Sequence, residues 1–80
     1  MKKILYFSAA WCGPCKTLGP IIGGSGVPYE KIDVDNNQEL SMKYGIRNIP
    51  TLVLIDKSGN ELNRSIGILQ KEQIIEFYNG

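Results

Sequence analysis

The chain has 80 residues, is 42% hydrophobic and 21% charged, and carries a formal net charge of +1 at pH 7. This length predicts a single domain over residues 1–80. The composition is that of an ordinary globular protein rather than a disordered one. Because its Lys and Arg residues are scattered, the sequence gives no electrostatic reason to expect nucleic acid or an anionic membrane as a partner.

The first predicted element is a buried strand over residues 3–8, because ILYF is an unbroken apolar run. The preceding Met-Lys-Lys resembles the start of a lipoprotein leader. However, four apolar residues are fewer than the roughly 7–15 of a leader core, and Trp11 is too bulky beside Cys12. We therefore expect no leader, no membrane span and a cytoplasmic protein. In that compartment a cysteine pair indicates redox or metal chemistry rather than a structural staple.

A helix is predicted next, from Cys12 to Ile22, with a kink at Pro20 because proline removes a backbone donor and crowds the previous turn. The GGSG run at 23–26 ends it. A second strand follows over Val27–Asp35.

The middle of the chain predicts a short helix between residues 36 and 44. We expect Asp35 or Asn36 to cap its first amides and Gly45 to end it in the left-handed conformation. TLVLI at 51–55 is the strongest strand pattern.

The last third predicts a hairpin and a helix. A Gly/Asn turn leads from the strand at 51–55 to its partner at 61–66. The final helix covers 70–78 with an apolar stripe of Ile74, Ile75 and Tyr78. The resulting order, β-α-β-α-β-β-α, predicts an α/β fold in which helices flank a four-stranded mixed sheet, parallel in the first β-α-β unit and antiparallel in the hairpin.

Cys12 and Cys15 are the only cysteines and enclose Gly13 and Pro14. Residues three apart at a helix start lie about 5–6 Å apart, within the Cα range that a disulfide tolerates. The free amides and dipole of the helix N-terminus favour a thiolate at Cys12, and we expect Cys15, one turn inside, to be more shielded. Pro14 removes one donor, which makes the disulfide less oxidising and favours a reductant.

Other uses of the Cys-x-x-Cys pair are less well supported. The chain has no histidine and no third cysteine, so only a dimer sharing four thiolates could complete a zinc site. Haem attachment needs a histidine where Lys16 stands. A purely structural disulfide across so short a loop would remove little entropy from the unfolded chain, so it would stabilise the fold only weakly. The pair therefore predicts reversible redox chemistry with neither metal nor cofactor.

Four segments together resemble the thioredoxin family, in the family's order and over nearly the whole chain. They are FSAAWCGPCKTLGP (7–20), KIDVD (31–35), KYGIRNIPTL (43–52) and GNELNRSIGILQKEQIIEF (59–77). The resemblance implies a minimal thioredoxin fold and the activity of a protein disulfide reductase. It also implies that Cys12 is the attacking thiolate and that Cys15 is the resolving thiol, which releases the reduced client.

A substrate-binding surface is implied by the same resemblance. Ile49-Pro50 would be a cis bond facing the sulfurs, and an extended client segment would pair with the backbone of Ile49. The residues implied to form this shallow apolar patch are Trp11, Gly13, Pro14, Ile49, Pro50 and Gly67. We therefore expect Trp11 at the surface.

The sequence also departs from the family pattern. It starts directly at the active-site strand, and GGSG shortens the first helix, a trimmed size that resembles glutaredoxins. Six residues before Cys12 the family usually has a buried carboxylate that manages the proton of the resolving thiol, but here the residue is Tyr6. Lys31 matches the partner lysine of that carboxylate. A phenol with an ordinary pKa near 10 cannot take a thiol proton at neutral pH, so we expect a slow resolving step.

The sequence thus predicts a monomeric thiol–disulfide oxidoreductase, and the resemblance implies that a thioredoxin reductase recharges it. Ribonucleotide reductase and peroxide-detoxifying enzymes are the family's typical clients. A glutaredoxin-like, glutathione-linked reductase is the alternative within this class. A non-catalytic binding module that uses its thiols as a slow switch, or shares them with a metal in a dimer, is the alternative outside it. We expect the strand over Val27–Asp35 to lie at a sheet edge, where its charges discourage pairing with another chain.

Overall fold

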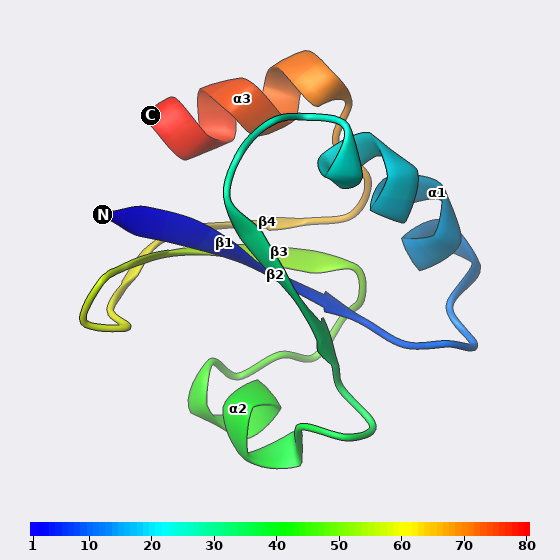
Figure 1. The fold of residues 1–80 in the computed structure, drawn as a ribbon. Coiled ribbons are helices and arrows are strands. Elements are labelled where there is room, and N and C mark those ends of the chain that lie inside the picture. The colour runs from blue at the N-terminus through cyan, green and yellow to red at the C-terminus, as the bar shows by residue number, and fades with distance from the viewer.

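The computed structural model describes all 80 residues and contains a mixed sheet between helices. Its elements are β1 (Lys2–Ser8), α1 (Gly13–Gly23), β2 (Tyr29–Asp33), α2 (Gln38–Lys43), β3 (Thr51–Asp56), β4 (Glu61–Ile66) and α3 (Lys71–Asn79). The sheet order is β2-β1-β3-β4, with β1 parallel to β2 and the β1–β3 and β3–β4 pairs antiparallel. Helices α1 and α3 cover one face, and α2 covers the other (Figure 1). The predicted fold class and element order are confirmed.

Alternating side chains along β1 build a hydrophobic core on each face of the sheet, because successive strand residues point to opposite faces. The core on the side of α1 and α3 consists of Ile4, Tyr6, Leu18, Ile22, Leu52, Leu54 and Ile74. The core on the side of α2 consists of Leu5, Phe7, Ile32, Tyr44, Val53 and Ile55. The central strands β1 and β3 are thus buried on both faces, which confirms the prediction made from the apolar run of β1. Because β1 is packed on both faces, the position of its last residue, Ser8, is well determined, and the segment that carries the cysteines begins directly after it.

Two predictions about the segment around β2 are wrong. The strand is shorter than Val27–Asp35, and α2 begins after Asn37 without any side-chain cap. The carboxylate of Asp33 instead organises the turn, because it accepts hydrogen bonds from the amide of Asp35 at 2.9 Å and from Nδ2 of Asn36 at 3.2 Å. This local side-chain turn ends β2 early, and the carboxylate of Asp35, one of the two expected caps, accepts a hydrogen bond from the Trp11 indole instead. As predicted, β2 is an edge strand.

The helix ends follow the sequence more closely. Helix α1 runs through Pro20 and ends in the GGSG segment, and Gly45 takes the expected positive φ of 61° after α2. In α3 the apolar stripe differs from the prediction. Ile74 is buried and both Phe77 and Tyr78 pack on its core, whereas Ile75 does not belong to that core.

Candidate active site

The cysteine pair lies where the central strand β1 meets helix α1. After Ser8 the chain makes a tight turn in which the amide of Cys12 donates to the carbonyl oxygen of Ala9 at 3.1 Å. Cys12 has extended backbone angles (φ −88°, ψ 112°) and is the N-cap residue of α1. Cys12 therefore lies at the N-terminus of α1, where the helix dipole and the free amides favour an anion.

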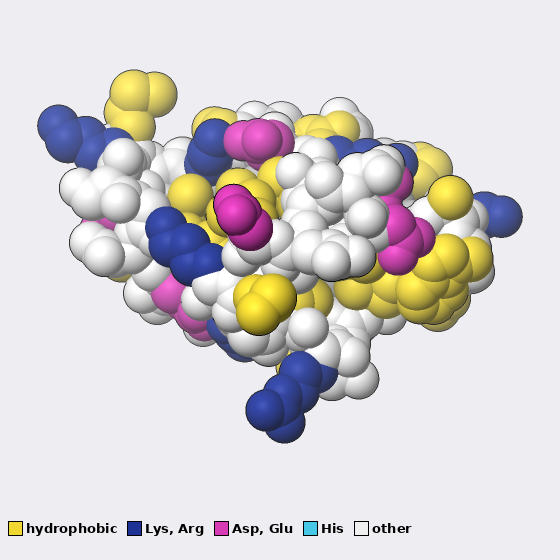
Figure 2. All heavy atoms as spheres, turned by 90° about the horizontal axis from the view of Figure 1, so that it is seen from below, with side chains coloured by type: hydrophobic (Ala, Val, Ile, Leu, Met, Phe, Trp, Pro, Cys, Tyr) yellow, Lys and Arg dark blue, Asp and Glu magenta, His cyan; other side chains and the backbone are white.

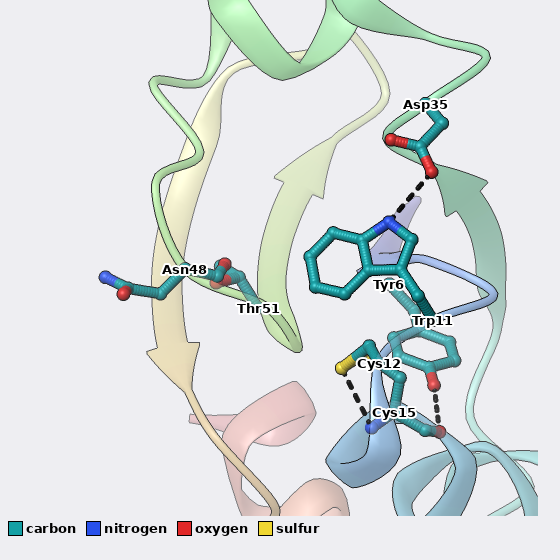
Figure 3. Close-up of a disulfide and its surroundings, with 7 residues drawn as sticks. All are labelled: Tyr6, Trp11, Cys12, Cys15, Asp35, Asn48 and Thr51. Carbon is teal, nitrogen blue, oxygen red and sulfur yellow. Dashed lines mark hydrogen bonds between the residues drawn. A yellow bond between two sulfur atoms is a disulfide. The ribbon is translucent and has the colours of Figure 1, made fainter.

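Cys12 and Cys15 form a disulfide with their Cα atoms 5.3 Å apart, as the spacing predicts. Sγ of Cys12 also accepts a hydrogen bond from the amide of Cys15 at 3.2 Å, so a donor is in place for a thiolate (Figure 3). Both residues are only 4% exposed, which corrects the expectation that Cys15 is the more shielded. The reason is tertiary packing, because both cysteines join Ala9 in a small cluster against Val34 and Ile49.

Trp11 lies at the surface beside this cluster, as expected, with 70% of its area exposed. Its indole Nε1 donates to Oδ2 of Asp35 at 3.0 Å, and Figure 3 shows the ring extending from the cysteine loop toward that carboxylate. Sequence reasoning treated Asp35 as a capping or edge residue and missed this role. The two residues are 24 positions apart, and no local pattern links them.

The Ile49-Pro50 bond is cis, which confirms the prediction. Ile49 packs against the cysteine cluster, and the carbonyl oxygen of Pro50 accepts a hydrogen bond from the amide of Gly67 at 2.9 Å. Gly67 has φ +97°, a backbone conformation that favours glycine. The hydroxyl of Thr51 donates to the carbonyl oxygen of Asn48, closing the loop before β3. The loop before β3 and the loop after β4 thus meet beside the cysteines.

The six residues expected in the apolar patch differ in their exposure to solvent. Trp11, Gly13 and Pro14 are exposed, Ile49 and Gly67 are partly buried, and Pro50 is buried. Ile66 and Ile68, which the sequence reasoning missed, flank Gly67 and are 60% and 40% exposed. Figure 2 shows hydrophobic side chains gathered at the end of the molecule where α1 begins in Figure 1, whereas charged side chains are dispersed.

Tyr6, which the sequence analysis identified as standing where the family usually has a carboxylate, contacts Cys15. Its side chain is 1% exposed, and its hydroxyl donates to the carbonyl oxygen of Cys15 at 2.6 Å. Burial raises the pKa of Tyr6 above its usual 10.0, so the phenol is neutral at physiological pH. The Ser8 hydroxyl acts in the opposite direction on that pKa, although its oxygen forms no hydrogen bond of ordinary geometry. Lys31 pairs with Tyr6 across β2 and β1 and is exposed.

A hollow of about 170 Å³ opens beside this group. It is lined by Tyr6, Ser8, Ala9, Ala10, Cys15, Lys16 and Lys31. No carboxylate contributes to the lining. Elsewhere, no group of three or more His, Cys, Asp or Glu side chains is placed to hold a metal ion. With at most 11 residues, no helix has the length and hydrophobicity needed to span a bilayer.

Comparison with known proteins gives consistent matches over this whole chain. The family model described as Thioredoxin matches residues 1–79. A thioredoxin of Bacillus subtilis is 42% identical over 91% of this chain and 75% of its own length. A thioredoxin of Haemophilus influenzae is 39% identical over 95% of this chain and 76% of its own length.

Solved structures agree with the sequence matches. A single-residue mutant of a thioredoxin from Halobacterium salinarum superposes with a TM-score of 0.86 at 33% identity, covering 98% of this chain and 72% of that one. The thioredoxin of Fasciola hepatica gives a TM-score of 0.86 at 32% identity, covering 98% of this chain and 78% of that one. Taken with the Cys12–Cys15 disulfide, these matches show that the chain belongs to the thioredoxin family and is a dithiol thiol–disulfide oxidoreductase of the protein disulfide reductase type.

Proposed function

We propose that Cys12 is the nucleophile that attacks client disulfides and that Cys15 resolves the resulting mixed disulfide. The observation that carries this assignment is the position of Cys12 as N-cap of α1, with its sulfur accepting the amide hydrogen of Cys15. Only the N-cap sulfur receives that stabilisation, so the thiolate form is favoured there first. Attack by the Cys12 thiolate breaks the client disulfide. Cys15 then attacks Sγ of Cys12, and the client leaves reduced.

We propose that the client binds across the apolar patch around the sulfurs. Trp11 and Pro14 offer exposed apolar surface on one side of the pair, and Ile66 and Ile68 offer it on the side of Gly67. An extended client segment can hydrogen-bond to the backbone at Ile49, in the manner of an added strand. This mode reads the client backbone more than its side chains, and it suits a reductant with several clients.

Thioredoxins act on disulfide-containing client proteins and are recycled by thioredoxin reductase. For this chain, we propose recycling by such a reductase in the cytoplasm, with ribonucleotide reductase or peroxide-detoxifying enzymes as clients and with the monomer as the active form. The short α1 keeps glutathione-linked recycling as the second candidate, since this trimmed size resembles glutaredoxins.

Trapping of mixed disulfides tests the assignment of the two cysteines. The variant Cys15→Ser should accumulate a covalent complex with disulfide-containing clients such as insulin, because the resolving thiol is missing. The matched variant Cys12→Ser should accumulate little, because its remaining thiol lacks the N-cap position. The reverse pattern would exchange the two roles.

Recycling is tested by coupling insulin reduction either to NADPH with a thioredoxin reductase or to NADPH with glutathione and glutathione reductase. Turnover with the first system alone supports the proposal. Turnover with the glutathione system alone would replace it with the glutaredoxin-like alternative.

A further inference from the structure

The resolving step requires a route for the proton of Cys15, and the residues around Cys15 offer no ordinary acceptor. The titratable groups that line the hollow with it are Tyr6 from β1, Lys16 from α1 and Lys31 from β2, and α3 contributes none. The Tyr6 hydroxyl is neutral and already donates to the carbonyl oxygen of Cys15. A lysine ammonium group carries donors and no acceptor. None of these three side chains therefore supplies an acceptor for the proton.

Ser8 is the buried polar side chain of the hollow whose hydroxyl lacks a hydrogen bond of ordinary geometry, although it acts on the pKa of Tyr6. It lies two residues after Tyr6 on the same face of β1, and it is 1% exposed. Its Oγ is the only buried side-chain nitrogen or oxygen in the protein without a hydrogen-bond partner. An unsatisfied buried hydroxyl costs stability, so its presence in the disulfide form calls for a physical explanation.

The hollow itself has the properties of a hydration site. Its volume of about 170 Å³ exceeds what one water molecule requires. Its buried lining residues include Ser8 and Cys15, whereas Ala10, Lys16 and Lys31 are exposed at its rim, so the hollow communicates with solvent. A serine hydroxyl turns about a single side-chain bond, and can thus present its oxygen to a water molecule without movement of β1.

We propose that Ser8 is a positioning residue that holds a water molecule in this hollow as the proton acceptor for Cys15. The proposal rests on the assignment of Cys15 as the resolving thiol. The Ser8 hydroxyl, which has no hydrogen-bond partner within the protein, bonds to this water, and the water in turn hydrogen-bonds to the Cys15 thiolate. Ser8 thereby stabilises that thiolate, a species that the disulfide form does not contain.

The step balances in atoms and electrons. In the mixed disulfide, the S–H bond of Cys15 breaks, and its proton passes to the water held by Ser8 and then to bulk solvent. The Cys15 thiolate forms a bond to Sγ of Cys12 while the bond from Cys12 to the client sulfur breaks. The electron pair of that bond leaves with the client sulfur, which is protonated by solvent. Over the full reaction the client gains two electrons and two protons, and the dithiol loses the same.

The direct test measures the pKa of Cys15 from the pH dependence of its alkylation by iodoacetamide. The measurement uses the Cys12→Ser background, in which Cys15 is the only thiol. Adding Ser8→Ala should raise that pKa by about one unit, equivalent to roughly a tenfold smaller thiolate fraction near neutral pH. Ser8→Thr, which keeps a hydroxyl, should restore it. An unchanged pKa in the Ser8→Ala variant would overturn the proposal.

A second readout uses the chain with both cysteines in glutathione buffers. At a pH above the pKa of Cys15, Ser8→Ala should shift the dithiol–disulfide equilibrium about tenfold toward the disulfide, which corresponds to about 30 mV for a two-electron couple. Because the removed oxygen has no partner within the protein, the disulfide form of this variant should fold and melt at the same temperature or higher.

The matched control is Ser25→Ala, since Ser25 is also buried but donates to the carbonyl oxygen of Ile22 away from the hollow. This control should lower the melting temperature and leave the redox equilibrium unchanged. A Ser8→Ala variant that changes only stability would show a structural role and overturn the proposal. If the unaltered chain fails to reduce insulin, the assigned function fails. If the unaltered chain is active and Ser8→Ala matches it in both readouts, only the role of Ser8 fails.

Discussion

Replacing Tyr6 with aspartate should accelerate the resolving step and destabilise the fold. Tyr6 is 1% exposed beside Cys15, so a carboxylate there lies in a low-dielectric site that raises its pKa toward neutrality. Such a group can accept the Cys15 proton at pH 7, and positioned proton acceptors contribute about 10²–10⁴-fold. Since part of the carboxylate stays protonated and the water route already operates, we expect the resolving rate to rise by about tenfold to a hundredfold, at or below the lower limit of that range.

The stability cost follows from the same burial. Tyr6 is one of seven residues in the core on the side of α1 and α3. Truncating a buried aromatic side chain costs about 3–5 kcal/mol, a large share of the 5–15 kcal/mol that typical domains have. The comparison variant Tyr6→Phe keeps the ring and loses one hydrogen bond, at about 0.5–1.5 kcal/mol. It supplies no carboxylate, so its resolving rate should equal that of the unaltered chain.

The assay is stopped-flow decay of a mixed disulfide formed at Cys12 with a chromogenic thiol, recorded from pH 5.5 to 8.5. Rates are normalised to the folded fraction obtained from urea unfolding of each variant. The Tyr6→Asp rate should exceed that of the unaltered chain most strongly near pH 7. A normalised rate equal to or below that of Tyr6→Phe would refute the argument that proton acceptance limits this step.

Three further predictions concern hydrogen bonds seen in the structure. Asp35→Ala should free the Trp11 indole, lowering its fluorescence anisotropy and reducing kcat/KM for insulin by about 2–10-fold, the value of one hydrogen bond. Asp35→Asn, which keeps an acceptor oxygen, should behave like the unaltered chain, and equal losses in both variants would point to charge instead. Because burial raises the pKa of Tyr6, its contribution to the free energy of unfolding is complete below pH 10 and is lost as the pH rises through the raised value. The difference in urea stability between Tyr6→Phe and the unaltered chain should therefore shrink above pH 10, and a constant difference up to pH 11.5 would contradict the assignment. The backbone amide of Asn60 is the main cause that lowers the pKa of Asp56, and other donors of the same turn add to it. The Asp56 carboxylate therefore stabilises the folded state above pH 3.8, and this contribution is lost as the pH falls through its lowered pKa. Acid titration followed by circular dichroism should show a smaller decline below pH 3.8 for Asp56→Asn, whereas an identical decline would exclude this carboxylate as a contributor.

Much of the fold was accessible from the sequence because its determinants are local. The apolar run of β1 predicted a strand buried on both faces, the apolar run of β3 predicted a strand, and the GGSG segment and Gly45 predicted the ends of two helices. Errors arose where local polar groups had two possible partners. Asp33 could lie within a longer strand or organise a turn, and the structure shows that its carboxylate accepts the amide of Asp35, so that β2 ends at Asp33.

In the candidate site, too, the features that depend on local sequence could be predicted, and those that depend on tertiary packing could not. The redox chemistry followed from the sequence alone, because a three-residue spacing at a helix start brings two sulfurs within bonding distance regardless of the rest of the chain. The environment of the sulfurs depended on tertiary structure. Strand register brings Asp35 to Trp11 and Gly67 to Pro50, and packing against Ile49 buries both cysteines equally.

The hollow shows the limit of the sequence most clearly. The sequence identified Tyr6 as an unusual neighbour of the cysteines and Lys31 as its partner, both by their positions relative to the active-site motif. It could not identify Ser8 as unsatisfied, since a serine in a strand draws no notice until every nearby donor and acceptor has been placed. Bond-forming distance along the chain is a local property and is determined by sequence, whereas burial and hydrogen-bond satisfaction depend on all the surrounding elements and are decided only by the tertiary structure.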